Sequence, residues 1–186
     1  MAYIKTIPPK EADGALKEIY DEILSKRGQV AEVLQIQSLN PDSLQDHLNS
    51  YMTIMFKKSP LSRQQREMMA VIVSSENGCQ YCQSHHGDAL NYFWKNLENI
   101  ELLKKSPELL ELPEVDRLLI RYATNLTNDP GKKHLEIINK LRACGLTDKA
   151  ILDATLVIGY FNFVNRIVQG LGVELGEEDS AKYKYD

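Results

Sequence analysis

Cysteine and net positive charge are both scarce in this sequence. Its 186 residues include three cysteines, which are too few for a small scaffold stapled by disulfides. Lys and Arg number 22 against 26 Asp and Glu, for a net charge of −4. Proteins that grip nucleic acid or an anionic membrane present a basic face, so this balance argues against both kinds of partner. We therefore expect a globular protein with no nucleic-acid partner.

Long hydrophobic runs are missing as well. No stretch approaches the ~20 uninterrupted apolar residues that cross a bilayer, and the densest run, over residues 154–164, is broken by Thr155, Gly159 and Asn162. The first fourteen residues hold no apolar stretch typical of a secretory signal. We therefore expect a cytoplasmic protein without a membrane partner. In that compartment two close cysteines are more typical of catalysis or metal binding than of a structural bridge.

Glycine-rich phosphate loops are also absent. Gly170-Leu171-Gly172 does not continue as GxGxxG, and no GK[ST] segment occurs. The sequence therefore gives no support to a nicotinamide, flavin or ATP site, and we expect no cofactor.

Helical periodicity is present throughout the chain, whereas strand-like alternation never persists for more than a few residues. Start signals are Asn40 before a proline, a capping-box pattern at Ser62 and Gln65, and Thr147. The sequence predicts an all-α fold in one domain, residues 1–186, with helices over about 16–28, 41–55, 62–77, 79–94, 113–126, 129–145 and 147–169.

Two of these predicted helices are apolar on more than one side, over residues 68–73 and 151–168. Such helices belong in a core or against another subunit. Because a chain of this size has few places to hide both, we expect part of this surface to form an oligomer interface. Two internal helices of a monomer are the alternative.

Residues 79–86 hold the most informative cluster. Cys79 and Cys82 lie one turn apart at the start of a predicted helix, with Cα atoms about 5–6 Å apart, which is compatible with a reversible disulfide. The N-terminal end of a helix favours thiolate over thiol. His86, four residues after Cys82, is placed to act as a base on that sulfur.

Glu67 extends this cluster from the preceding helix. It lies about 15 Å from the turn along its own helix, and His86 lies about 10 Å along the next. If the two helices are antiparallel, Glu67 falls near the level of His86. A carboxylate behind a histidine fixes its tautomer and raises its basicity, as in other activated nucleophiles.

Glu67, Cys79, Cys82 and His86 match the E-x11-C-x2-C-x3-H signature of alkylhydroperoxidase D-like proteins in the carboxymuconolactone decarboxylase superfamily. The segment SRQQREMMAVIVSSENGCQYCQSHHGDAL, with YFNFVNR and GLGVEL near the end, resembles the peroxidase-related branch. The likeness covers a core of about residues 39–176. It leaves an N-terminal helical extension of about 1–38 and a tail of 177–186, which we expect to fray.

The resemblance implies an alkylhydroperoxidase D-like helical bundle that forms a homo-oligomer, a trimer or a hexamer, and performs thiol peroxidase chemistry. Cys82 resembles the peroxidatic cysteine, Cys79 the resolving cysteine, His86 the base and Glu67 its relay partner. The implied partners are a small-molecule peroxide and a thiol electron donor, such as a lipoyl-bearing or thioredoxin-like protein. Some members have a histidine directly before the second cysteine, where this chain has Tyr81.

Several alternatives stay open. In one alternative, the two cysteines act only as small buried hydrophobic residues. In another, they bind zinc together with His86 and a fourth ligand from Cys144, His47 or His134. Other function classes are a lactone enzyme like carboxymuconolactone decarboxylase, a disulfide oxidoreductase without peroxide specificity, and a non-enzymatic helical assembly module. Among other polar residues, we expect His85 at the surface or an interface and Cys144 as a packed structural thiol. Asn162, Asn165, Arg166 and Gln169 form a polar stripe that faces solvent, or else a subunit contact or the active pocket.

Overall fold

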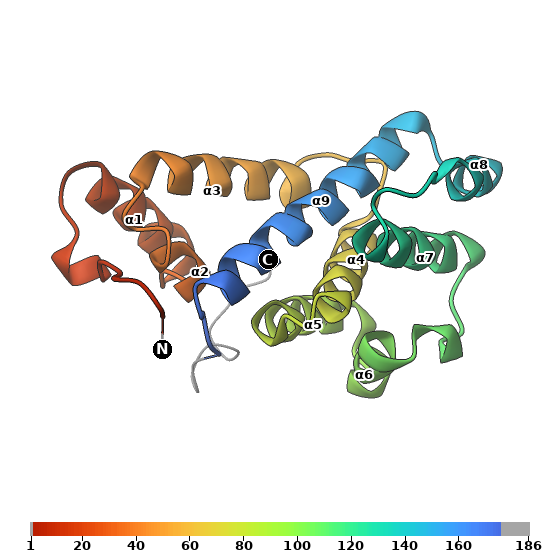
Figure 1. Cartoon of the computed structure of the whole chain (residues 1–186), viewed down its shortest axis with the longest axis horizontal. Helices are drawn as coiled ribbons and strands as arrows, with labels where there is room; N and C mark the ends of the chain where they lie inside the picture. The colour runs from red at the N-terminus through yellow and green to blue at the C-terminus, as the bar shows by residue number, and fades with distance from the viewer. Residues whose placement is uncertain (1, 176–186) are drawn as a thin grey trace.

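The chain folds into helices that run in several directions (Figure 1). The computed structural model describes residues 2–175, and these residues contain no strand. The predicted all-α class is confirmed, whereas the predicted tail, 177–186, lies outside the described residues. The elements are η1 (Pro9–Glu11), α1 (Gly14–Arg27), α2 (Glu32–Gln35), α3 (Pro41–Phe56), α4 (Arg63–Glu76), α5 (Gln80–Trp94), α6 (Leu97–Lys105), η2 (Pro107–Leu109), α7 (Glu114–Asn128), α8 (Leu135–Ala143) and α9 (Asp148–Gly170).

Helix α4 is the core of the fold. Every residue from Arg66 to Ser74 is buried, because α3, α5, α6, α7 and α9 all pack against this helix. Its all-round apolar surface is therefore covered by the chain itself. Helix α4 is an internal helix, and the predicted oligomer interface, which needs only part of the apolar surface, would fall on the other helix.

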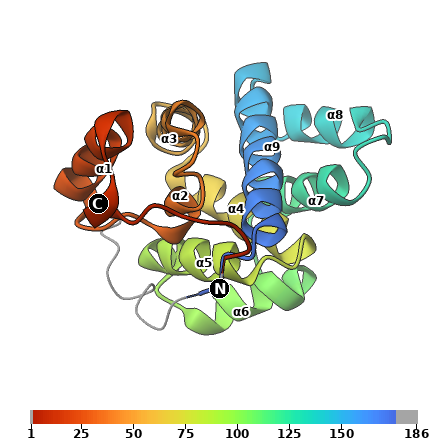
Figure 2. The same cartoon turned by 60° about the vertical axis from the view of Figure 1, so that its left-hand side comes forward.

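Helix α9 crosses the molecule and contacts α3, α4, α7 and α8 (Figures 1 and 2). By length and composition alone it could cross a bilayer, but half of its most apolar segment is buried inside the fold. This is the pattern of a core helix. Leu152, Leu156 and Phe163 nevertheless remain exposed on its other side.

The first helices form a second, smaller apolar cluster. Leu16, Ile19, Tyr20 and Ile23 of α1 pack with residues of α2 and with Leu44 of α3. Figure 2 shows α1, in red, beside α3 and on the far side of it from α9. This cluster holds α1 against α2 and α3.

Local start signals are confirmed where the sequence predicted them. Asn40 accepts a hydrogen bond from Ser43 N, Thr147 accepts one from Ala150 N, and Ser62 and Gln65 form a reciprocal capping box. The predicted start at 129–130 is wrong, because α8 begins at Leu135. Asp129 instead closes α7 through its N–H to Asn125 O. Helices α2 and α6 were not predicted from the sequence.

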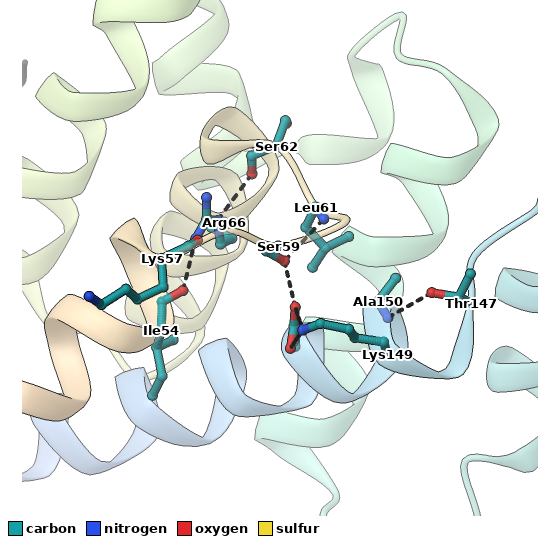
Figure 3. A network of polar contacts seen from close by, with 10 residues as sticks. Ile54, Lys57, Ser59, Leu61, Ser62, Arg66, Thr147, Lys149 and Ala150 are labelled. Atoms are coloured by element: carbon teal, nitrogen blue, oxygen red, sulfur yellow. Dashed lines mark hydrogen bonds and ion pairs between the residues drawn. The ribbon is translucent and has the colours of Figure 1, made fainter.

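Buried polar contacts fix the connection between α3 and α4 (Figure 3). The Arg66 guanidinium donates to the carbonyl oxygens of Ile54, Lys57 and Ser62. The Ser59 hydroxyl donates to Asp153 of α9 at 2.6 Å and accepts from the N–H of Leu61. These bonds hold the start of α4, which carries the candidate site, against the end of α3.

Candidate functional site

A tight turn between α4 and α5 positions the predicted cysteines. Gly78 adopts φ 66°, in the left-handed region that favours glycine. Cys79 follows as the N-cap of α5, and its N–H donates to Ser74 O at 2.8 Å. The two helices then run side by side, which brings residues of α4 opposite residues of α5.

The predicted contact between Glu67 and His86 is present. His86 Nδ1 lies 2.6 Å from Glu67 Oε2, and the Glu67 side chain is fully buried. Because a carboxylate only accepts, His86 Nδ1 donates, which leaves Nε2 to accept a proton. The geometry therefore places an oriented imidazole one turn after Cys82.

Arg63 is a second partner of the same carboxylate, and the sequence analysis missed it. Its Nε lies 2.7 Å from Glu67 Oε1, and its guanidinium covers the Phe56 ring at 3.7 Å. Burial alone would raise the pKa of Glu67, but the charges and hydrogen bonds of His86 and Arg63 outweigh it and lower that pKa. The i, i+4 spacing of Arg63 and Glu67 on one helix was the available signal.

Cys79 and Cys82 are free, buried thiols that contact each other. The hydrogen bond between them lowers the pKa of Cys79 and, together with burial, raises the pKa of Cys82 well above its usual value. At Cys82 these effects outweigh the helix N-terminus, which was expected to favour thiolate over thiol. Loss of the Cys82 proton requires a base.

A cavity of about 440 Å³ opens next to this cluster. Cys82 and His86 line it, whereas Cys79 does not. Most of the wall is apolar and comes from α1, α2, α3, α5 and α9, and Lys26, Arg27 and Arg63 add positive charge. The apolar lining residues are Ile19, Ile23, Ala31, Val33, Leu34, Leu48, Met52, Phe56, Ala89, Phe161 and Val164.

The polar stripe on α9 divides into a buried and an exposed part. Asn165 is completely buried, donates to Ser74 Oγ, accepts from Asn77, and forms a hydrogen bond with Cys82 that lowers the pKa of this thiol. A solvent-facing position is therefore wrong for Asn165, which lies beside the cysteines. Arg166 is exposed, as expected. The available sequence signal for a buried Asn165 was the apolar residues Phe161, Val164 and Val168, which share its helical face.

Two further predictions, for Cys144 and His85, have outcomes. Cys144 is exposed, so its assignment as a packed structural thiol is wrong. His85 is half-buried and lines the cavity with its ring against Tyr81, rather than lying on the surface. Tyr81 is buried, and its hydroxyl accepts from Val33 N at 3.4 Å. This phenol holds α2 in place.

The zinc alternative receives no support from the geometry. Within residues 2–175, no three His, Cys, Asp or Glu side chains are grouped so as to hold a metal ion. Both ring nitrogens of His47, one proposed fourth ligand, contact Gln37 and Tyr160.

Comparison with known proteins identifies similar families and folds. Residues 42–91 match the carboxymuconolactone decarboxylase family, and no curated protein sequence matches the chain. A peroxidase-related protein from Silicibacter sp. TM1040 is 26% identical with a TM-score of 0.86, over 98% of this chain and 96% of that one. A peroxidase-related protein with an alkylhydroperoxidase D core, from Ralstonia eutropha JMP134, is 21% identical with a TM-score of 0.86, over 96% and 94%.

A third similar structure carries a different activity in its name. The debrominase Bmp8 shares 18% identity with a TM-score of 0.72, over 87% of this chain and 86% of that one. A cysteine-to-alanine variant of it, in complex with 2,3,4-tribromopyrrole, has a TM-score of 0.75. At this identity the likeness concerns the fold.

Proposed function

We propose that this chain, which resembles the carboxymuconolactone decarboxylase family over residues 42–91 and the alkylhydroperoxidase D-like proteins in its fold, is a thiol-dependent peroxidase of organic hydroperoxides. One observation carries the proposal. The buried Glu67 carboxylate orients His86 beside two free thiols, and only Cys82 of those two reaches the cavity.

The first step is attack by Cys82. His86 Nε2 takes the Cys82 proton, and Glu67 stabilises the imidazolium that forms. The thiolate attacks the terminal oxygen of the hydroperoxide, so that an S–O bond forms and the O–O bond breaks. The departing alkoxide takes the proton from His86, which leaves an alcohol and a Cys82 sulfenic acid.

Cys79 completes the cycle as the resolving thiol. Its sulfur, one turn from Cys82, attacks the sulfenic acid sulfur, so that a disulfide forms and water leaves. An external dithiol then reduces the disulfide by exchange. The sum is one hydroperoxide and two external thiols giving an alcohol, water and an external disulfide.

The cavity favours a bulky, apolar peroxide over hydrogen peroxide. Its volume of about 440 Å³ and its largely aliphatic and aromatic wall suit a hydrocarbon body. Hydrogen peroxide would leave that wall in contact with water and would gain no apolar burial.

Peroxide consumption tests the proposal. With dihydrolipoamide or thioredoxin as the reductant, wild type should consume cumene hydroperoxide faster than hydrogen peroxide. Cys82→Ser should abolish consumption, and Cys79→Ser should allow one turnover that ends in a sulfenic acid trapped by dimedone. Cys144→Ser is the matched control and should keep the wild-type rate. Consumption at the wild-type rate by Cys82→Ser would refute the proposal.

Reductive debromination is a second candidate, because an apolar cavity that opens on a cysteine also suits a halogenated ring. Two thiols would supply two electrons, bromide would leave, and a proton would take its place on carbon. A brominated pyrrole in the same assay distinguishes this candidate by bromide release. A lactone enzyme would keep its activity without either cysteine, and a general disulfide oxidoreductase would reduce insulin while ignoring peroxides.

A further inference from the structure

A second polar chain, the hydrogen-bonded series Gln37–His47–Tyr160, reaches the same cavity and takes no part in the Glu67–His86 relay. His47 of α3 is 5% exposed. Its Nδ1 lies 2.6 Å from Gln37 Nε2, and its Nε2 lies 2.6 Å from the hydroxyl of Tyr160 on α9. His47 and Tyr160 both line the cavity with Cys82. Nothing in the proposed reaction so far uses them.

The direction of each hydrogen bond in this polar chain follows from the contacts of Gln37. Gln37 Nε2 also lies 2.8 Å from the Val33 carbonyl oxygen, which only accepts. The amide nitrogen must therefore face both Val33 and His47, so it donates to both and His47 Nδ1 accepts. Burial lowers the pKa of His47 to about 4, which keeps the ring neutral near pH 7. Its single ring proton is then on Nε2 and is donated to the Tyr160 oxygen.

The hydroxyl of Tyr160 is left with its own proton to donate. Since His47 already donates to this oxygen, the Tyr160 O–H points elsewhere, and within residues 2–175 it has no other hydrogen-bond partner. The phenol is 8% exposed and lines the cavity. A ligand in the cavity that carries an acceptor atom would satisfy this donor.

The neighbours of Tyr160 place this donor on the reacting side of the cavity. The next residue along α9, Phe161, packs edge-on against His86 with 4.5 Å between ring centroids. Tyr51 stacks on the Tyr160 ring at 5.8 Å and holds it in place. Consecutive residues of α9 therefore contact the two histidines, and the two polar chains converge near Cys82.

We propose that Tyr160 donates a hydrogen bond to an oxygen atom of the ligand, and that His47 and Gln37 are positioning residues that set its direction. Resting on the proposed function, the inference assigns this oxygen to the atom that leaves as alkoxide when Cys82 attacks. The alkoxide is still neutralised by the proton from His86. Tyr160 keeps its own proton, because burial raises its pKa well above the ordinary value. The ligand class is an apolar molecule with one oxygen acceptor.

Tyr160→Phe is the direct test, since it removes the hydroxyl and keeps the stacked ring. Loss of one donor to a developing oxyanion costs about 10²–10³-fold in rate, and we expect Cys82 oxidation by cumene hydroperoxide to slow at the lower end of that range. Alkylation of Cys82 by iodoacetamide, in which no oxygen leaves, should keep its rate. Tyr122→Phe is the matched control, because the buried Tyr122 hydroxyl bonds to Thr155 and lines no part of the cavity.

Two outcomes would overturn the inference. One is a Tyr160→Phe protein that reacts with the hydroperoxide as fast as wild type. The other is an equal slowing of hydroperoxide reaction and alkylation, which would mean a structural role. The positioning role of His47 is tested by ¹⁵N NMR at pH 7, where we expect the tautomer with a protonated Nε2 and an unprotonated Nδ1. The opposite tautomer would refute the directed chain.

A binding measurement keeps the inference testable if wild type consumes no peroxide and the proposed function fails. The probes are 2-phenyl-2-propanol and isopropylbenzene, which differ by one hydroxyl, titrated against the reduced protein by NMR. Tyr160→Phe should lower the alcohol-to-hydrocarbon affinity ratio about tenfold, the value of one hydrogen bond, and Tyr122→Phe should not. An unchanged ratio would refute the inference on its own.

Discussion

At the scale of single residues, the Glu67 carboxylate holds two side chains that have different roles. Arg63 binds one oxygen and lies against the Phe56 ring, while His86 binds the other and faces the cavity. Because the pKa of Glu67 is lowered, this carboxylate stays charged although its side chain is fully buried. The imidazole is thereby held in one tautomer, and the Cys82 proton has a defined acceptor.

We predict that Glu67→Gln slows Cys82 oxidation by a hydroperoxide about 10²-fold, the scale of general base catalysis. The amide is similar in size but cannot stabilise the imidazolium. His86→Ala should cost a similar factor, and the double variant little more, because coupled residues lose their effect together. Stopped-flow rates measure this, with the exposed Glu76→Gln on the same helix as control. Losses that multiply in the double variant would contradict the relay.

His47 makes a separate prediction about pH and stability. Its pKa is about 4 in the fold and 6.5 for the exposed ring, so the unfolded chain binds the extra proton between these values. The neutral ring therefore stabilises the fold fully above pH 6.5, and that stabilisation, about 3 kcal/mol, is lost as the pH falls toward 4. Urea unfolding at pH 7 and pH 4.5 should show a steeper loss for wild type than for His47→Gln. Equal losses would contradict the shifted pKa.

At the scale of elements, the α4–α5 turn brings together residues that are close in sequence, whereas the cavity is built from distant ones. Helix starts with side-chain caps could be predicted because a cap involves neighbouring residues, and so could the level of Glu67 and His86, which follows from helix rise. The start of α8 could not, because Pro130 signals a helix start and a helix exit equally well. His47 and Tyr160 are 113 positions apart, and only tertiary packing brings them together.

The spacing of Cys79 and Cys82 at the start of α5 predicts that mild hydroperoxide treatment forms a disulfide between them. Peptide mapping by mass spectrometry measures the bridge, with Cys144→Ser as the background that removes the exposed competing thiol. Two free thiols at 79 and 82 after complete oxidation of Cys144 in wild type would contradict it.

The α3–α4 connection carries a stability prediction. Arg66 is 6% exposed and donates to three carbonyl oxygens (Figure 3). Arg66→Leu should lower the free energy of unfolding by roughly 2–4 kcal/mol, because three backbone carbonyl oxygens lose a buried, charged donor. Urea unfolding measures this. Arg142→Leu, at an exposed arginine of α8, should change stability by less than about 0.5 kcal/mol, and equal effects of the two variants would contradict the role of Arg66.

At the scale of the whole molecule, helix α9 keeps an apolar stripe that residues 2–175 leave exposed. Leu152, Leu156 and Phe163 of α9 are 57%, 45% and 49% exposed. Their spacing places them on one stripe of the helix, where Gly159 adds no side chain. Because α4 is enclosed by the chain itself, this stripe is the part of the apolar helices that remains for a partner subunit.

We therefore predict a homo-oligomer at micromolar concentration, with the α9 stripe in its interface. Light scattering after gel filtration should give a multiple of the 21.2 kDa chain mass, and Leu156→Glu should shift it toward the monomer while circular dichroism stays helical. A charge placed in a desolvated contact costs several kcal/mol, whereas the same charge on an open surface costs little. Leu109→Glu, at a residue 66% exposed outside α9, is the matched control and should keep the wild-type mass. A wild-type mass near that of one chain would contradict the interface, because the stripe would then face water in solution.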